Sequence, residues 1–192
     1  MRAFLIKASK SCTAPIFSLK SLASTSGRLD VVLRSIISAF WWGEKLRKDV
    51  TFYALLEGPP RPPLVVEIHG TRLKKLPKSE TELAEIFCRL FKGEKIRGFK
   101  VYRENFRELV RRLSNIYEVV YLHEDGVDIR TFKFTRTPLF ILGDHEGLDS
   151  ESEEFLKNLR IPWISLGPIP YLASHCVIMV NEELDRKFRS QG

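Results

Sequence analysis

Cysteine and histidine are scarce in this sequence. Its 192 residues include only three Cys and four His. The cysteines, at Cys12, Cys88 and Cys176, show no Cys-x-x-Cys spacing, which excludes a zinc ribbon and a disulfide framework and favours a reducing, cytoplasmic location. No His-x-x-x-His spacing occurs either, so we expect no metal site.

Long apolar runs are also missing. The N-terminus lacks the apolar core of a signal peptide, and no run approaches the ~18 apolar residues of a membrane span, so we expect no membrane association. Hydrophobic residues make up 44% of the chain and charged residues 29%, which excludes collagen-like, disordered and coiled-coil classes. The length is typical of one domain, and we expect a single domain over residues 1–192.

The charge that is present is unevenly distributed. The whole chain carries +7. Residues 1–137 hold 26 Lys and Arg against 15 Asp and Glu, a net charge of +11, whereas residues 138–192 hold 5 against 9, a net charge of −4. A basic surface favours an anionic partner, so the two parts suggest separate roles.

Strand-like and helix-like patterns alternate along the chain. Short apolar runs predict strands at 3–6, 50–56, 64–68, 119–122, 139–142 and 161–166. Apolar residues at helical spacing predict helices at about 30–42 with a stop at Gly43, at 104–113 and around 177–188. A capping box at Ser79 and Glu82 predicts a helix that ends at Gly93, and Ser150 with Glu153 predicts the cap of a further short helix. The alternation predicts an α/β fold with a mostly parallel sheet.

Two of the predicted strands run directly into loops that contain glycine. Residues 139–142 lead into Gly143-Asp144-His145-Glu146-Gly147, and residues 163–166 lead into Gly167-Pro168-Ile169-Pro170. In a parallel sheet the carboxyl ends of the strands form the ligand crevice, and glycine allows a backbone group to approach a ligand closely. The alternative is that both loops are simply tight turns.

Several motifs in order resemble one known family. They are the segments 140–147, 164–168 and 173–176 in the last third, and 4–8, Gly27-Arg28-Leu29-Asp30, 47–50 and 52–54 in the first half. Together they resemble the TrmY family of archaeal tRNA (pseudouridine-54-N1)-methyltransferases, which is of the SPOUT class. The resemblance covers nearly the whole chain and is weakest between about residues 80 and 116.

The resemblance implies a SPOUT-type fold with a C-terminal trefoil knot, a homodimer and S-adenosylmethionine (SAM) as methyl donor. Residues 138–192 would form the knot and bind the cofactor, and residues 1–137 would face RNA. Carried over by position, the cofactor contacts would be Leu122, Gly143, Leu166, Gly167, Pro168, Ile169, Pro170, Tyr171 and Cys176. Apolar side chains with a few main-chain hydrogen bonds are what an adenine ring requires.

Two residues are candidates for chemistry. Methylation at N1 of pseudouridine requires removal of one proton, and a carboxylate within hydrogen-bond reach can accept it. Asp49 is the preferred candidate; the alternative is a surface carboxylate paired with Arg47 or Lys48. Cys176 could form a covalent adduct with the base, although a packing role against the cofactor is the alternative, because a nitrogen nucleophile needs no such adduct.

The basic part offers candidates for RNA contacts. Arg103, Arg107 and Arg111 recur at four-residue intervals within a stretch of basic and aromatic residues between 89 and 112, and we expect them to contact the RNA backbone. Arg28 and Asp30 are placed to meet the target nucleotide, with a local salt bridge between them as the alternative.

The function expected from this resemblance is SAM-dependent methylation of N1 of pseudouridine 54 in the T-loop of tRNA. A related SPOUT enzyme acting on ribosomal pseudouridine or on a ribose 2′-hydroxyl is an alternative. A basic RNA-binding module without catalysis is another, which the charge of residues 1–137 alone would satisfy.

Overall fold

A seven-stranded sheet forms the centre of the molecule. The computed structural model describes residues 1–189, with side chains for residues 1–187. The strand order is β6-β5-β4-β1-β8-β7-β9. The strands are β1 (Arg2–Ala8), β4 (Val50–Leu56), β5 (Leu64–His69), β6 (Phe99–Tyr102), β7 (Glu118–Asp128), β8 (Pro138–Gly143) and β9 (Trp163–Ser165). A separate hairpin contains β2 (Trp41–Trp42) and β3 (Lys45–Leu46).

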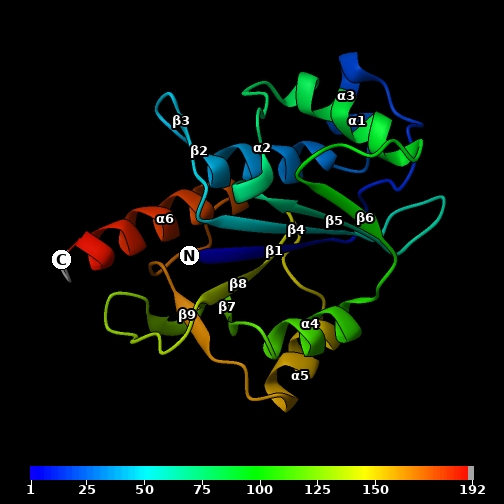
Figure 1. Ribbon diagram of the computed structural model, residues 1–192. Helices are drawn as coiled ribbons and strands as arrows, with labels where there is room; N and C mark the ends of the chain where they lie inside the picture. The colour runs from blue at the N-terminus through cyan, green and yellow to red at the C-terminus, as the bar shows by residue number, and fades with distance from the viewer. Residues whose placement is uncertain (190–192) are drawn as a thin grey trace.

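Helices cover both faces of this sheet (Figure 1). They are α1 (Leu22–Thr25), α2 (Leu29–Phe40), α3 (Glu80–Phe91), α4 (Phe106–Ser114), α5 (Ser150–Asn158) and α6 (Ala173–Arg189), with single 3-10 turns at Leu19–Ser21 and Gly70–Arg72. Helices α2, α3 and α6 lie on one face, and α4 and α5 lie on the other. The prediction of an α/β fold with a mostly parallel sheet is confirmed.

Five of the strands are parallel. β1 pairs in parallel with β4 and β8, and β7 pairs in parallel with β8 and β9. β5 runs antiparallel to β4 because the proline-rich turn at 58–63 sends the chain straight back as a hairpin, and β6 in turn pairs antiparallel with β5. The carboxyl ends of β1, β4, β7, β8 and β9 therefore meet at one edge of the sheet, called here the carboxyl edge.

The core is divided into two layers by the alternation of side chains along the strands. In β1, Phe4 and Ile6 point into the layer under α2, α3 and α6, and Leu5 points into the layer under α4 and α5. All three are fully buried. A central parallel strand covered on both faces reads as a continuous apolar run, which is why β1 was predictable from sequence.

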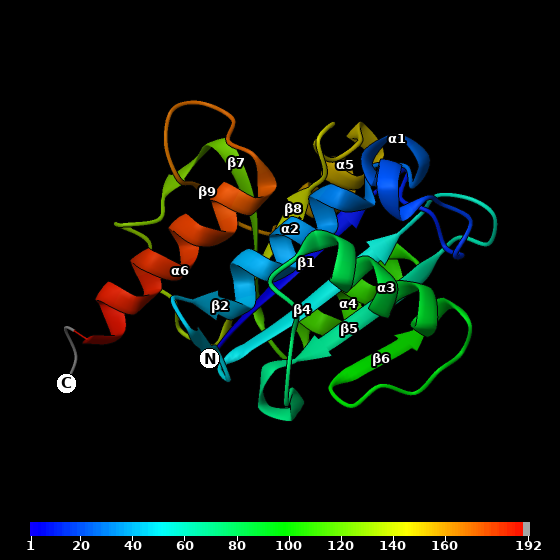
Figure 2. The same ribbon diagram turned by 90° about the horizontal axis from the view of Figure 1, so that it is seen from above.

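Helix α6 returns across the sheet to lie beside α2 (Figure 2). At its contact with the start of β1, the guanidinium of Arg2 donates to the backbone oxygen and the side-chain Oδ1 of Asn181, at 3.0 and 3.1 Å. Asn181 in turn donates to the carbonyl oxygens of Ser38 and Ala39 at the end of α2. These bonds join the last helix to the first strand and to α2.

Several predicted boundaries are corrected. Helix α2 ends at Phe40, before Gly43, because Trp41 and Trp42 enter the β2–β3 hairpin. The cap of α5 is Asp149, whose carboxylate accepts from the backbone N–H of Ser152, where we predicted Ser150. Ser79 caps α3 as predicted.

Strand β6 was not predicted, and the three arginines after it that we expect to contact RNA do not all lie on one helix. Helix α4 begins only at Phe106 and is capped by Asn105, so Arg103 lies outside the helix that holds Arg107 and Arg111. Phe106 is buried, and only 5% of its surface is exposed. It is therefore part of the core and unavailable for stacking on RNA bases.

Candidate cofactor pocket and RNA-facing residues

A pocket of about 540 Å³ opens at the carboxyl edge of β7, β8 and β9. Both glycine-containing loops contribute to its wall. The predicted cofactor residues that line it are Leu122, Gly143, Leu166, Gly167, Ile169, Pro170, Tyr171 and Cys176. Pro168 belongs to the same loop but is not part of the lining. The volume is in the range of small-molecule sites, roughly 300–1,000 Å³.

Gly143 is required by the close approach of two backbone segments. A Cβ atom placed on Gly143 would lie 2.1 Å from the carbonyl carbon of Gly147. Asp144 and Gly147 form a short antiparallel bridge, so the 143–147 loop folds back on itself over the end of β8. Only glycine leaves room for that return.

Asp144 holds this loop against the end of β1. Its carboxylate accepts hydrogen bonds from the backbone N–H and the hydroxyl of Ser9, both at 2.9 Å, and from the backbone N–H of Glu146 at 2.9 Å. Only 1% of the Asp144 side chain is exposed. With its oxygens engaged in this way, Asp144 serves to shape the loop.

The 166–172 loop supplies apolar surface together with unused backbone donors. Leu166, Ile169 and Pro170 face the pocket. Within the part of the chain that the structure describes, the backbone N–H groups of Ile169 and Tyr171 have no hydrogen-bond acceptor. An apolar slot edged with free main-chain groups matches the needs of an adenine ring, so the residues present fit a nucleoside cofactor.

Cys176 lies at the first turn of α6 beside this loop. Burial raises the pKa of its thiol to about 11. Its Sγ donates weakly to the carbonyl oxygen of Tyr171, at 3.7 Å. A thiol in this environment stays protonated near neutral pH, whereas nucleophilic attack requires the thiolate.

A polar and aromatic group on the opposite wall was not identified from sequence. The hydroxyl of Tyr121 donates to Oε1 of Glu153 at 2.9 Å. The ring of His123 lies 4.5 Å from the ring of Trp163, and its Nε2 is 3.9 Å from the same Glu153 oxygen. From sequence, Glu153 was assigned to the start of a helix. The one sequence signal for this group was that Tyr121 immediately precedes Leu122, a predicted cofactor residue at the end of a predicted strand.

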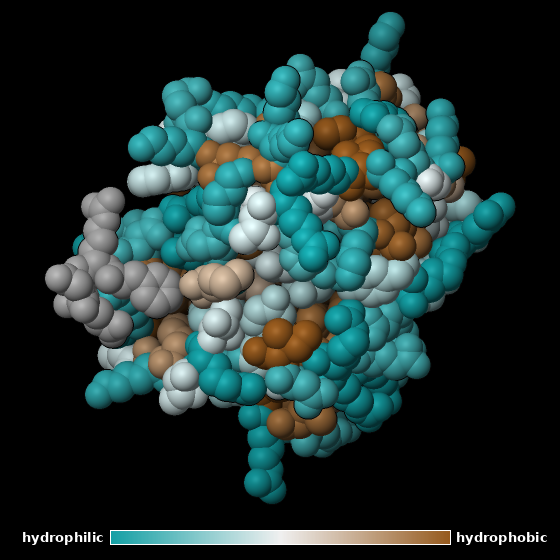
Figure 3. All heavy atoms as spheres, in the orientation of Figure 1, coloured by the Kyte–Doolittle hydropathy of each residue, from teal (hydrophilic) through white to brown (hydrophobic). Residues whose placement is uncertain are grey.

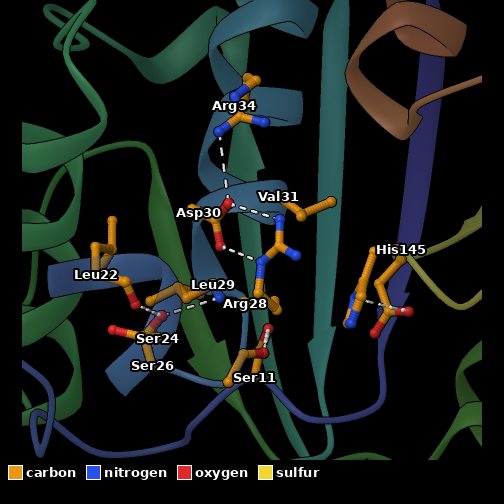
Figure 4. A network of polar contacts seen from close by, with 12 residues as sticks. Ser11, Leu22, Ser24, Ser26, Arg28, Leu29, Asp30, Val31, Arg34 and His145 are labelled. Atoms are coloured by element: carbon orange, nitrogen blue, oxygen red, sulfur yellow. Dashed lines mark hydrogen bonds and ion pairs between the residues drawn. The ribbon is translucent and has the colours of Figure 1, made fainter.

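Arg28 lines the pocket and lies beside the buried Asp30 (Figure 4). The guanidinium of Arg28 donates to both oxygens of Asp30, at 3.0 and 3.1 Å, while Arg34 contacts the same carboxylate at 3.5 Å. Arg28 adopts a left-handed backbone, φ +65°, just before α2. The local salt bridge left open by the sequence is thus present, and Figure 4 shows it with His145 on the facing side.

The three remaining arginines are not equivalent. Arg103 donates to the carbonyl oxygens of Arg61 and Pro63, and so braces the proline-rich turn. Arg107 pairs with Glu151, and its guanidinium lies 5.4 Å from the ring centre of Phe155, as does that of Arg111. Arg107 and Arg111 therefore lie over α5, away from Arg103.

Asp49 lies far from the pocket residues. It precedes β4 at the amino edge of the sheet, and the seven residues of β4 separate it from the carboxyl edge by about 20 Å. Its carboxylate accepts from Arg2 at 2.9 Å, rather than from Arg47, which pairs with Asp185 instead. Within one chain the position of Asp49 is that of a structural ion pair.

No group of three or more metal-ligating side chains that could hold a metal ion occurs among residues 1–187. In the same described part of the chain, no helix has the length and apolar character needed to cross a membrane.

Comparison with solved structures identifies the class of fold. The structure of Nep1 from Archaeoglobus fulgidus, bound to S-adenosylhomocysteine, matches with a TM-score of 0.71 at 15% sequence identity, over 96% of this chain and 97% of that one. This similarity shows that the chain shares the fold of Nep1, with its pocket at the carboxyl edge of the sheet.

Sequence comparison then gives the family. Residues 1–188 match the family described as "Putative SAM-dependent RNA methyltransferase", and the chain belongs to this family. A relative from Thermococcus kodakarensis is 39% identical over 96% of this chain and 99% of its own length, and one from Methanocaldococcus jannaschii is 34% identical over 97% and 98%. Both are named tRNA (pseudouridine(54)-N(1))-methyltransferase, which confirms the resemblance found in the motifs.

Proposed function

We propose that this protein transfers the methyl group of SAM to N1 of pseudouridine 54 in tRNA. The observation that carries the proposal is the agreement between full-length relatives named for this reaction and a nucleoside-sized pocket at the carboxyl edge. No specific feature of the structure favours a ribosomal substrate. A non-catalytic RNA-binding module is not favoured either, because a module without catalysis has no use for an apolar nucleoside pocket.

The pocket residues would hold SAM through its adenosine part. Leu122, Leu166 and Ile169 offer the apolar slot, and the free backbone N–H groups of the 166–172 loop offer hydrogen bonds to the adenine edge. Gly143 would contribute backbone, and Cys176 would close the slot by packing. When bound, SAM supplies an already activated methyl group, so the protein has chiefly to orient the two partners.

The reaction forms a bond between N1 and the methyl carbon, breaks the bond from that carbon to sulfur, and releases the proton of N1. Glu146, whose carboxylate pairs with Lys10, and Glu153, whose carboxylate accepts from Tyr121, are the pocket carboxylates that we propose as acceptors of this proton. We do not assign this role to Asp49 within one chain. Asp49 could act only if a second chain brought its own Asp49 to the pocket.

Arg28 and Asp30 are proposed to meet the target nucleotide. The salt bridge fixes the guanidinium at the pocket rim, and Arg28 has a further N–H that points away from Asp30 and could contact a phosphate. Arg103, Arg107 and Arg111 are proposed to contact the RNA backbone, although their separation means that they would contact different phosphates.

We further propose that the protein is a homodimer. Ile169 and Leu172, in the loop before α6, are 56% and 59% exposed, and Ile178 in α6 is 52% exposed. Exposed large apolar side chains are typical of an interface between chains.

The knot, the division of labour and the location are also proposals. After β7 the chain enters the sheet as β8, leaves to the outer position as β9, and crosses back as α6, which is the kind of path that a trefoil knot needs. Within the single domain, residues 138–192 would bind SAM and the basic residues 1–137 would face RNA. Three free cysteines support a cytoplasmic location.

A defined pair of substrates tests the proposal. The protein is incubated with labelled SAM and tRNA that carries either pseudouridine or uridine at position 54. We expect label only in the pseudouridine form, because N1 of uridine is bonded to the ribose. Equal labelling of both forms would disprove the N1 mechanism at this position.

A further inference from the structure

A second and larger groove, of about 840 Å³, lies at the far side of the carboxyl edge from the SAM pocket. Its walls are the 13–16 segment, the proline-rich turn, the end of α3 and the edge strand β6. Neither the pocket residues nor the predicted RNA contacts, apart from Arg103, belong to it.

The lining of this groove includes accessible apolar side chains. Ile16 is 63% exposed and Val101 is 37% exposed, and the half-buried Phe91 and Phe99, which also line the groove, are packed against the core. Figure 3 shows apolar side chains at the surface around α3 and β6, bordered by hydrophilic ones.

The rim of the groove carries positive charge that nothing in the described chain neutralises. Arg61, Lys95 and Lys100 are exposed and form no ion pair with any described residue. The fourth cation, Arg103, contacts only carbonyl oxygens. The single acidic residue of the groove, Glu94, is already paired with Arg89. In contrast, Arg107 and Arg112 elsewhere on the surface pair with carboxylates.

One short segment connects this groove to the SAM pocket. Ser9 is hydrogen-bonded to the pocket loop at Asp144, and Thr13, four residues later, accepts from the backbone N–H of Arg61 at the groove. Four residues span at most about 14 Å. A polymer whose one unit occupies the pocket can therefore reach the groove with neighbouring units.

We propose that this groove binds an unpaired stretch of the RNA substrate next to the methylated nucleotide. The inference rests on the proposed function. The rim cations would neutralise phosphates, and unstacked bases would lie on the floor formed by Ile16, Phe91, Phe99 and Val101. Bases inside a duplex face one another and could not reach that floor, so the groove selects single-stranded or looped RNA.

The charge part of the proposal is tested with two triple variants that change net charge equally. The groove variant is Arg61→Glu, Lys95→Glu and Lys100→Glu, and the control is Lys74→Glu, Lys75→Glu and Lys133→Glu, at exposed sites outside the groove. By fluorescence anisotropy we expect the groove variant to bind tRNA at least ~10-fold more weakly than the control, with a salt slope lower by about 2. Calorimetry should show unchanged SAM affinity in both.

The apolar part is tested with the double variant Ile16→Ser and Val101→Ser, both at exposed positions. We expect it to lose most of the wild-type preference for tRNA over a blunt RNA duplex with the same number of phosphates. Equal tRNA affinity of the groove and control variants would overturn the proposal and leave a protein partner as the occupant of the groove. If the wild type binds tRNA but does not methylate it, the proposed function fails while the groove proposal is still decided by the variants.

Discussion

The carboxylate of Asp144 accepts two hydrogen bonds from Ser9, one from its backbone N–H and one from its hydroxyl, each at 2.9 Å. Because Ser9 follows β1 and Asp144 follows β8, this contact ties the ends of two central strands together beside the proposed SAM pocket.

Replacing Asp144 should therefore loosen the pocket. We expect Asp144→Ala to lower the free energy of unfolding by about 2 kcal/mol, because buried donors lose their acceptor, and to weaken SAM binding about tenfold. Ser9→Ala is the matched control, since it removes one hydroxyl and keeps the backbone bond. Urea unfolding and calorimetry measure both quantities, and an Asp144→Ala protein with wild-type SAM affinity would contradict the role.

The two glycines of the pocket should respond differently to an added methyl group. A Cβ on Gly143 would meet the backbone of Gly147 at 2.1 Å, whereas a Cβ on Gly167 would meet the movable hydroxyl of Tyr171 at 2.6 Å. We expect Gly143→Ala to abolish SAM binding and Gly167→Ala to weaken it only a few-fold. Calorimetry with S-adenosylhomocysteine compares them, and equal losses would mean that backbone crowding at Gly143 is not decisive.

Cys176 should be dispensable for chemistry. Since burial raises the pKa of its thiol to about 11, almost no thiolate is present at neutral pH. We expect Cys176→Ala to keep kcat within about threefold and to leave the pH–rate profile below pH 9 unchanged. Loss of all activity in both Cys176→Ala and Cys176→Ser, with SAM affinity intact, would instead establish a covalent role.

The ion pair of Asp149 with Lys7 should make stability depend on pH. Burial alone would raise the pKa of Asp149, but hydrogen bonds from Lys7 and Ser152 outweigh it and lower that pKa to about 2. A carboxyl group with a depressed folded-state pKa stabilises the fold above its unfolded value, near 3.8, and loses this contribution as pH falls toward 2.

The variant Asp149→Asn isolates this effect, because asparagine also caps helices well. We expect it to be less stable than the wild type at pH 6 and the difference to shrink steadily between about pH 5 and pH 2. Urea midpoints across that range measure the difference. A gap that stayed constant with pH would show that the carboxylate charge of Asp149 contributes nothing.

Asp49 and Asp185 form a natural pair of controls, because both accept from the buried Arg2. We expect Asp185→Ala to reduce stability more than Asp49→Ala, because Asp185 also pairs with Arg47, and we expect both variants to retain methylation per folded molecule. If Asp49→Ala alone abolished methylation while SAM binding survived, Asp49 would be the proton acceptor, supplied to the pocket by a second chain.

The strands and the pocket loops were predictable because their signals are local. Each buried parallel strand is a continuous apolar run, and the motifs that end in glycine lie directly after such runs. Strand β6 escaped detection because it has only four residues, and Lys100 and Val101, its two central ones, are exposed on the two faces of an edge.

The positions of the polar site residues were less predictable. Sequence placed Asp49 at the start of a strand but could not say which edge of the sheet that start occupies. Glu153 lies three residues after a helix start and its position predicts a helix-dipole partner, yet its carboxylate accepts a hydrogen bond from Tyr121 in the wall of the pocket. Such relations depend on strand order, which requires long-range pairing that no local pattern encodes.

The pairing of β1 with β8 has a consequence for synthesis of the protein. Ala3 pairs with Leu139, so one side of the central strand has no partner until 136 further residues have been made. At ribosomal speeds of 5–20 residues per second that wait is roughly 7–27 s. During this time the edge of β1 is open to incorrect pairing, and the SAM pocket, whose walls follow β8 and β9, can form only when the chain is almost finished.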